Sequence, residues 1–124
     1  DALYASLRLL RVIGNSGRRL SGLAADIPQY HSTPEIRVRC PDELKFKVVD
    51  DLREHFKKNH EVIDIDGARV LFDGGWGLVR ASNTGPVLVL RFEAREQERL
   101  PEIRKQFFSL LRRYPEVELP EDEA

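Results

Sequence analysis

The sequence predicts an α+β domain in which a mainly antiparallel sheet of four strands carries two helices on one face. Three observations support this class. Segments with period-two alternation lie on both sides of a helical segment, Asp-Gly turns separate neighbouring strand segments, and a second amphipathic helix follows the last strand. From residue 35 the predicted order is β-α-β-β-β-α. Short turns join antiparallel strands, and covering one sheet face with both helices is the simplest way to bury it.

The first predicted helix covers residues 2–14. Its apolar residues recur at helical spacing and include Leu3, Leu7, Leu10 and Ile13. Because Tyr4 and Leu9 lie off that stripe, the helix should be buried on more than one side. We expect residues 1–30 to be the terminal helix and linker of a preceding domain, in a chain cut from a longer one. Without its partner the helix should fold back, pair between chains or move.

The next elements are a half-buried strand and a helix. Ile36 and Val38 alternate with charged neighbours over residues 35–39. A helix then follows Pro41, with Asp42 as its expected cap. Its apolar stripe is Leu44, Val48, Leu52 and Phe56, and its basic residues Lys45, Lys47, Arg53, Lys57 and Lys58 are expected on the solvated face.

Strand segments and a helix complete the domain. The segments at 61–65 and 69–72 flank the turn Asp66-Gly67, which predicts a hairpin. Further strands are predicted at 76–82 and 86–93, and the last helix at 95–113. Domain boundaries follow at residues 31–115, with an acidic flexible tail over residues 116–124.

Composition excludes several classes of protein. The 124 residues suffice for one compact domain. Lys and Arg total 20 and Asp and Glu total 21, so no global field favours nucleic acid or an anionic membrane. A single cysteine, Cys40, excludes an internal disulfide and favours a reducing, cytoplasmic location. No apolar run approaches the roughly 20 residues of a membrane span.

The segment Ser82-Asn83-Thr84-Gly85-Pro86, preceded by Arg80, combines groups that suit an anion. The Arg80 guanidinium is a planar fork matched to phosphate oxygens. Three short polar side chains follow it, and Gly85 permits backbone angles that aim amide groups into a concave turn. The loop contains no carboxylate. An ordinary hairpin turn is the alternative that these residues leave open.

A longer stretch resembles a known family. Residues 73–93 read DGGWGLVRASNTGPVLVLRFE, and the pattern G-W-x-L-x-R-x-S-N-T-x-P within them is similar to the C-terminal domain, domain 4, of the alpha-D-phosphohexomutases. The bacterial phosphomannomutase/phosphoglucomutase branch matches best, and the likeness extends over essentially the whole chain. It implies a TATA-box-binding-protein-like arrangement of the sheet and helices. Gly85 departs from relatives that carry Glu or Thr there, which puts any side-chain role at that position in doubt.

The resemblance also implies a function. Arg80, Ser82, Asn83 and Thr84 would bind the substrate phosphate that is not being transferred, with possible additions from Ala81 and Gly85. The full-length enzyme would be an isomerase that interconverts glucose or mannose 1- and 6-phosphates through a phosphoserine and a hexose 1,6-bisphosphate. Magnesium would assist, but its ligands and the catalytic serine lie outside this chain. We expect no mutase activity from the chain alone.

Expected partners are therefore a sugar phosphate and the other domains of the same enzyme, with neither nucleic acid nor a membrane. The competing hypothesis is a stand-alone α+β module that binds a protein with its open sheet face. RNA is a weaker alternative for that face, because the outward positions Val79, Val87 and Val89 offer no stacking aromatic ring.

Overall fold

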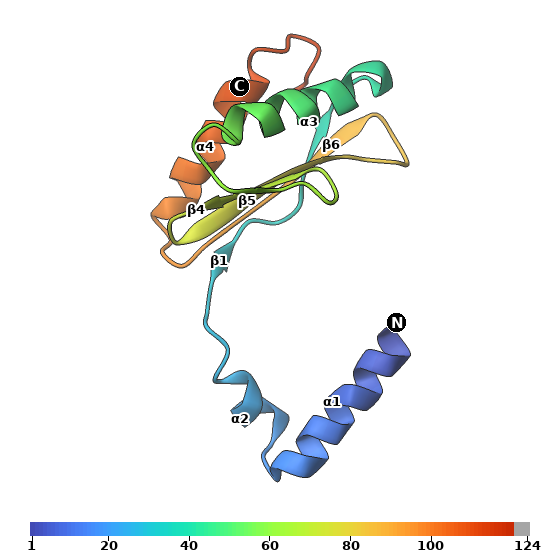
Figure 1. Cartoon of the computed structure of the whole chain (residues 1–124), viewed down its shortest axis with the longest axis vertical. Coiled ribbons are helices and arrows are strands. Elements are labelled where there is room, and N and C mark those ends of the chain that lie inside the picture. The colour runs from blue at the N-terminus through green and yellow to red at the C-terminus, as the bar shows by residue number, and fades with distance from the viewer. Residues whose placement is uncertain (121–124) are drawn as a thin grey trace.

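The computed structural model describes residues 1–120 and shows an α+β arrangement (Figure 1). Its helices and strands follow one another along the chain as α1 (Ala2–Ser16), α2 (Leu20–Ala24), β1 (His31–Ser32), β2 (Ile36–Arg39), α3 (Asp42–Phe56), β3 (Val62–Ile63), β4 (Ala68–Phe72), β5 (Gly75–Ala81), β6 (Val87–Ala94) and α4 (Arg99–Leu111).

All strand pairings are antiparallel, which confirms the predicted class. The sheet order in the described residues is β1-β6-β5-β4-β3, with β2 also paired to β6. This sheet has six strands and not the four predicted. The difference comes from β1, for which no strand was predicted, and from β3, which lies within the predicted segment 61–65 and was not counted as a separate strand of the sheet.

The helices α3 and α4 cover the same face of the sheet, as expected (Figure 1). Alternate residues of the long strands point into this layer, and Val79, Leu90 and Phe92 are fully or almost fully buried there. The prediction that Val79 faces outward is therefore wrong, because β5 turns Gly77 and Val79 toward the helices. The helices contribute the buried residues Val48, Leu52, Phe56, Ile103, Phe107, Phe108 and Leu111. Burial of each such side chain stabilises the fold by about 1.5–3 kcal/mol.

A close approach between β5 and α4 explains the glycines beside Trp76. A Cβ at Gly77 would lie 2.5 Å from the Phe107 ring, and one at Gly75 would lie 2.7 Å from Ile103. Only a residue without a side chain lets α4 pack this close to the strand. The glycines therefore serve the core, while Trp76 lies on the opposite face of the sheet.

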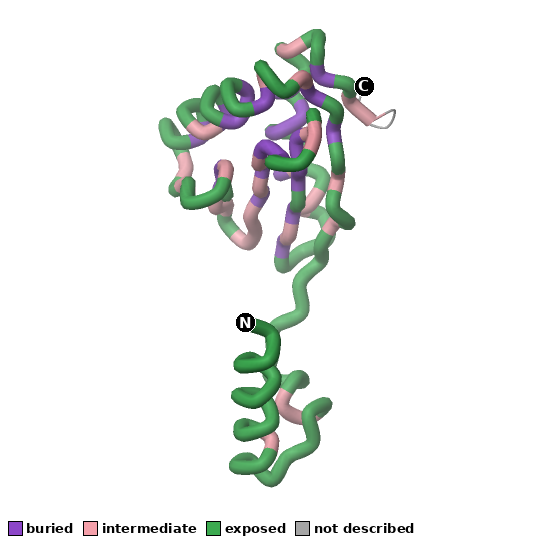
Figure 2. The backbone as a smooth tube through the Cα atoms, turned by 90° about the vertical axis from the view of Figure 1, so that its right-hand side faces the viewer, coloured by how far each residue is buried: buried purple, intermediate pink, exposed green. Residues whose placement is uncertain are grey.

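The helix α1 stands away from the sheet domain (Figure 2). None of its residues is buried, and Leu3 and Leu10 are 73% and 64% exposed. Its ends are well formed, because Asp1 accepts a hydrogen bond from the Tyr4 amide and Gly17 takes the left-handed conformation. The helix thus does not fold back onto the sheet. Whether it pairs between chains stays a prediction.

The structure moves two predicted boundaries, the start of α3 and the end of the packed domain. Asp42 is not the cap of α3: Pro41 holds that position and Asp42 is the first helical residue. The packed domain also extends beyond residue 115, because Val117 is buried and the Glu118 amide donates a hydrogen bond to the Arg39 carbonyl. The rest of the expected acidic tail, residues 121–124, lies outside the described residues.

Candidate functional site

The predicted phosphate loop, residues 82–86, connects β5 to β6. Its base is closed by a hydrogen bond from the Ser82 amide to the Val87 carbonyl. A second bond, from the Cys40 amide to the Pro86 carbonyl, ties the loop to the segment that precedes α3. Backbone bonds therefore fix both ends of the loop, and its middle residues, Asn83 and Thr84, are exposed.

The structure brings two of the predicted hydroxyl groups together. The Ser82 Oγ and Thr84 Oγ1 atoms lie 3.2 Å apart, and the Thr84 amide donates to Ser82 Oγ over 3.2 Å. A serine hydroxyl that accepts from the amide two residues later forms a tight turn. Ser82 is only 6% exposed, so its hydroxyl is held within the loop. Both hydroxyls are thus ordered beside the exposed tip.

Arg80 lies on β5, two residues before the loop, and its side chain is 40% exposed. Its Nη1 atom lies 3.3 Å from Oδ2 of Asp66, which belongs to the β3–β4 turn. The loop itself has no carboxylate, but this neighbouring turn places one against the arginine. Sequence reasoning missed this contact. In the β4–β5 pairing Ala68 lies opposite Val79, so the turn before Ala68 must lie beside Arg80.

Gly67 fixes how closely that turn approaches Arg80. Its φ is 82°, and a Cβ there would lie 2.3 Å from the Val79 carbonyl and 2.6 Å from the Arg80 Cβ. Both the left-handed backbone and the short distances require glycine at this position. The Asp66-Gly67 turn therefore positions the Arg80 backbone as well as its guanidinium.

Asn83 and Ala81 also line a cavity of about 140 Å³, together with Phe46 of α3 and Gly67. Three aspartates, Asp50, Asp64 and Asp66, line the same cavity with one arginine, Arg53. Its carboxylates outnumber its basic groups, so the cavity suits a phosphate less well than the surface beside Arg80 and the hydroxyl pair.

Gly85 does not use the freedom that the sequence suggested. The glycines with positive φ are Gly17, Gly67 and Gly74, so Gly85 adopts a backbone conformation open to other residues. A Cβ at Gly85 would have no atom within 4 Å. A larger residue at this position would fit without displacing the loop.

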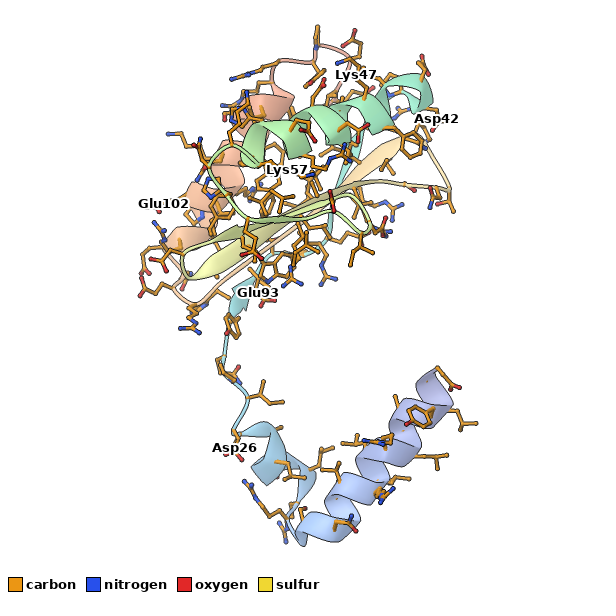
Figure 3. All side chains as sticks on the ribbon, in the orientation of Figure 1. Asp26, Asp42, Lys47, Lys57, Glu93 and Glu102 are labelled. Carbon is orange, nitrogen blue, oxygen red and sulfur yellow. The ribbon has the colours of Figure 1, made fainter. Side chains whose placement is uncertain are left out.

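Lys45 contradicts the expectation that all basic residues of α3 are solvated. Its side chain is buried beneath the loop, and its ammonium donates to the carbonyls of Ser82 and Gly85. Lys47, in contrast, points into solvent on the same helix (Figure 3). The sequence does contain a pattern that indicates this burial, because Lys45 precedes the buried Val48, Val49 and Leu52 at helical spacing.

The sheet face that the helices leave open is rich in arginine. Arg37, Arg69, Arg80 and Arg91 lie on four neighbouring strands, and the Arg69 guanidinium stacks over the Trp76 ring at 4.3 Å. Trp76 lies, half-buried, on this open face, where the sequence predicted no aromatic ring. Glu35 pairs with Arg37, so part of this positive charge is neutralised.

Other kinds of site find less support in residues 1–120. No helix there is long and apolar enough to cross a membrane. The same residues contain no group of three or more His, Cys, Asp or Glu side chains that could hold a metal ion. Cys40 is buried, and burial raises the pKa of its thiol, so it is a poor nucleophile.

Known proteins resemble this chain over the sheet domain, including the loop between β5 and β6. The family model described as phosphoglucomutase/phosphomannomutase, C-terminal domain, matches residues 35–110. This span includes β2, α3, all of α4 except its last residue, and the whole loop between β5 and β6.

Several curated relatives align with nearly all of the chain. A phosphomannomutase/phosphoglucomutase of Pseudomonas putida is 44% identical over 122 residues, which are 97% of this chain and 26% of that protein. A phosphoglucomutase of Neisseria meningitidis is 42% identical over 123 residues, with the same coverage. A probable phosphoglucosamine mutase of Methanopyrus kandleri is 39% identical over 91% of this chain and 25% of the relative. The chain thus spans about a quarter of these relatives.

A solved structure shows the same arrangement. The crystal structure of a phosphoglucomutase/phosphomannomutase family protein from Burkholderia thailandensis superposes with a TM-score of 0.75 at 38% identity. The match covers 97% of this chain and 25% of the other. The N-terminal helix and the sheet domain therefore both have counterparts in one larger protein.

Proposed function

The chain belongs to the phosphoglucomutase/phosphomannomutase family as its C-terminal domain, and from this premise we propose that it holds the substrate phosphate in a phosphohexose mutase. The whole enzyme would interconvert hexose 1-phosphates and 6-phosphates. The chain's part in this reaction is to bind and orient, because the groups described above are donors and not nucleophiles.

One observation carries the proposal: a partly exposed arginine lies next to a loop with two ordered hydroxyls and no carboxylate of its own. Arg80, Ser82, Asn83 and Thr84 would donate to the phosphate, with backbone groups of Ala81 and Gly85 as further candidates. Charge-assisted hydrogen bonds contribute about 1.5–3 kcal/mol each. Three or four of them give roughly micromolar to millimolar affinity after the cost of ordering.

Such a site would recognise the phosphate rather than the sugar. A hexose that turns around between two phosphoryl transfers must present either end to the same donors. A charge-and-donor site accepts both ends, and by fixing one phosphate it aligns the other with the reacting group. The exposure of Asn83 and Thr84 requires another part of the enzyme to close over the sugar and exclude water.

The remaining chemistry would reside outside this chain. We propose that residues 1–30 belong to a neighbouring domain and that residues 31 onward form the phosphate-binding domain. The phosphoserine and the magnesium ion would come from the other three quarters of a cytoplasmic enzyme. The described residues do not fit a metal site, so no step here is assigned to a metal.

Phosphorus NMR of the ligand tests the proposal. Glucose 1-phosphate, glucose 6-phosphate and inorganic phosphate are titrated with the 124-residue chain, with unphosphorylated glucose as competitor. We expect the phosphorus signals of all three to shift, with dissociation constants in roughly the micromolar to millimolar range, and glucose to displace none of them. Arg80→Met should remove the shifts. Equal shifts with Arg80→Met would mean that the phosphate binds elsewhere.

A further inference from the structure

Lys45 occupies an unusual position for a lysine. It lies in the first turns of α3 and is 5% exposed, and the buried polar residues among those described are Lys45 and Ser82. Lysine is almost never buried unless its ammonium is paired. The two buried polar residues are joined to each other, since Lys45 donates to the Ser82 carbonyl.

The Lys45 ammonium has three acceptors for its three protons. Nζ lies 2.5 Å from the Ser82 carbonyl oxygen, 3.1 Å from the Gly85 carbonyl oxygen and 2.6 Å from Oδ1 of Asp42. The first two acceptors lie 37 and 40 residues away along the chain. One side chain therefore links the start of α3 to both sides of the loop tip.

Holding these carbonyls determines where the loop's donors point. In a trans peptide unit the carbonyl and the following amide point in opposite directions, and residues 1–120 contain no cis peptide. With the Ser82 carbonyl turned toward Lys45, the Asn83 amide must point to the other side of the loop. The peptide after Gly85 carries no amide proton, because Pro86 follows. The contact with Lys45 thus turns an acceptor inward and a donor outward.

The position of the Lys45 ammonium near the beginning of α3 is electrostatically unfavourable by itself. A cation near the beginning of a helix meets the positive end of the helix dipole. Asp42, in the same turn, offsets this cost, and its contact with Lys45 replaces the capping role expected for it. A buried cation that is unfavourable beside the helix dipole, and that needs Asp42 to offset this cost, indicates a specific function for the lysine.

We propose that Lys45 is a positioning residue of the phosphate loop. Its ammonium holds the carbonyls of Ser82 and Gly85, so that the Asn83 amide and the neighbouring hydroxyls are already arranged for a phosphate monoester. The inference rests on the proposed function of the loop and adds a residue outside the loop to it. Lys45 touches no ligand in this account and acts through the loop alone.

The test compares phosphate affinity in variants of the 124-residue chain. Lys45→Met removes the donors at similar length, Lys45→Arg retains charge and donors, and Lys47→Met is the matched control on the solvated face of the same helix. Dissociation constants for glucose 1-phosphate come from phosphorus NMR. Amide spectra report whether each variant is folded and where the Asn83 signal lies.

We expect Lys45→Met to weaken binding about 10-fold, because loss of a charge-assisted bond that orders a binding loop has this size. Its Asn83 amide signal should shift in the free protein while signals of β4 and α4 stay in place. Lys45→Arg should bind within about threefold of the parent, and Lys47→Met should be unchanged. A purely structural lysine would lower stability without changing the affinity of the folded fraction.

Each outcome decides the proposal. Equal affinity for Lys45→Met and the parent overturns it, and so does a variant spectrum that changes across the whole sheet. If Lys45→Met does not fold, Lys45→Gln replaces it, with the same expected loss of affinity. If that variant also fails to fold, Lys45 supports the whole domain and the proposal is overturned. Absence of phosphate binding by the parent chain would instead contradict the proposed function itself.

Discussion

At the scale of single residues, Arg80 is held by a carboxylate that a bound phosphate would have to displace. The pair with Asp66 is exposed, with 68% of the aspartate side chain accessible. An ion pair of this kind contributes about 0.2–1 kcal/mol. The contact orients the guanidinium in the free chain and at the same time lowers its affinity for an anion.

Replacing Asp66 by asparagine should therefore strengthen phosphate binding by about 1.4- to 5-fold, which is the free energy of the exposed ion pair converted to an affinity ratio. Phosphorus NMR titration measures the change. Asp64→Asn is the control. It also removes one negative charge, two residues from Asp66, but the Asp64 carboxylate pairs with Lys57 and not with Arg80. Weaker binding in Asp66→Asn would show that the aspartate orients Arg80 more than it competes for it.

A second residue-scale prediction concerns two glycines near the site. Gly67→Ala should lower the free energy of unfolding by about 2 kcal/mol or more, because its φ is positive and its Cβ would meet the Val79 carbonyl. Gly85→Ala should be close to neutral, since open space surrounds that position. Urea denaturation of both variants measures the difference. Similar stability for the two would contradict the described turn.

The sequence predicted the loop residues but not the groups around them. Arg80 and residues 82–85 are contiguous, so a local motif reveals them. Asp66 and Lys45 reach the same place through strand pairing and helix packing, which a local motif does not contain. Helical periodicity places Lys45 on the buried face of α3, yet its charge argued for solvent, and only the loop carbonyls explain its burial.

At the scale of elements, the long strands and both packed helices were predictable. Alternation in β5 and β6 and the Asp-Gly turns reflect half-buried antiparallel pairs, and α3 shows a clear apolar stripe. The short strand β1 was not. β1 forms because His31 and Ser32 happen to lie beside the end of β6, where Ala94 and Glu93 offer backbone partners. Such pairing depends on the tertiary fold.

A hydrogen bond between α3 and the end of α4 gives an element-scale prediction. The Tyr114 hydroxyl donates to Oδ2 of Asp51 over 2.7 Å, and burial, together with this bond, raises the pKa of Tyr114 to about 12. The hydrogen bonds from Lys47 and Tyr114 lower the pKa of Asp51. A raised tyrosine pKa stabilises the fold below the unfolded value of about 10, and this stabilisation is lost as the pH rises toward 12.

Tyr114→Phe should accordingly reduce the free energy of unfolding by about 1 kcal/mol at pH 7. The difference from the parent chain should shrink between pH 10 and about 12, because the parent alone loses the bond there. Urea denaturation at pH 7, 10 and 11.5 measures it, with Tyr30→Phe in the linker as control. A difference that stays constant over this range would contradict the assignment of the hydrogen bond.

At the scale of the whole molecule, the chain is one part of a larger arrangement. It covers 26% of the Pseudomonas putida relative, and α1 exposes an apolar surface that the sheet domain does not cover. The alignments with that relative and with the Burkholderia structure each cover 97% of this chain, so they include most of α1 along with the sheet domain. The sequence pattern of α1 predicted this unsatisfied surface, since its apolar residues extend around much of the helix.

A chimera tests the place of the chain in an enzyme. The corresponding quarter of the Pseudomonas putida phosphomannomutase/phosphoglucomutase is replaced by this chain, and mutase activity is measured. We expect activity in the chimera and none in the 124-residue chain. Arg80→Met in the chimera should lower kcat/KM by about 100-fold or more, the loss expected for two charge-assisted bonds to phosphate. A fully active Arg80→Met chimera would remove the loop from the reaction.

Binding of phosphate by the loop after β5 can be measured by an amide-resolved NMR titration of the 124-residue chain with glucose 1-phosphate. We expect saturable shifts confined to residues 80–85 and their neighbours Lys45 and Asp66, and their loss in Arg80→Met. Shifts spread over the open sheet face, or no shifts at millimolar glucose 1-phosphate, would contradict it.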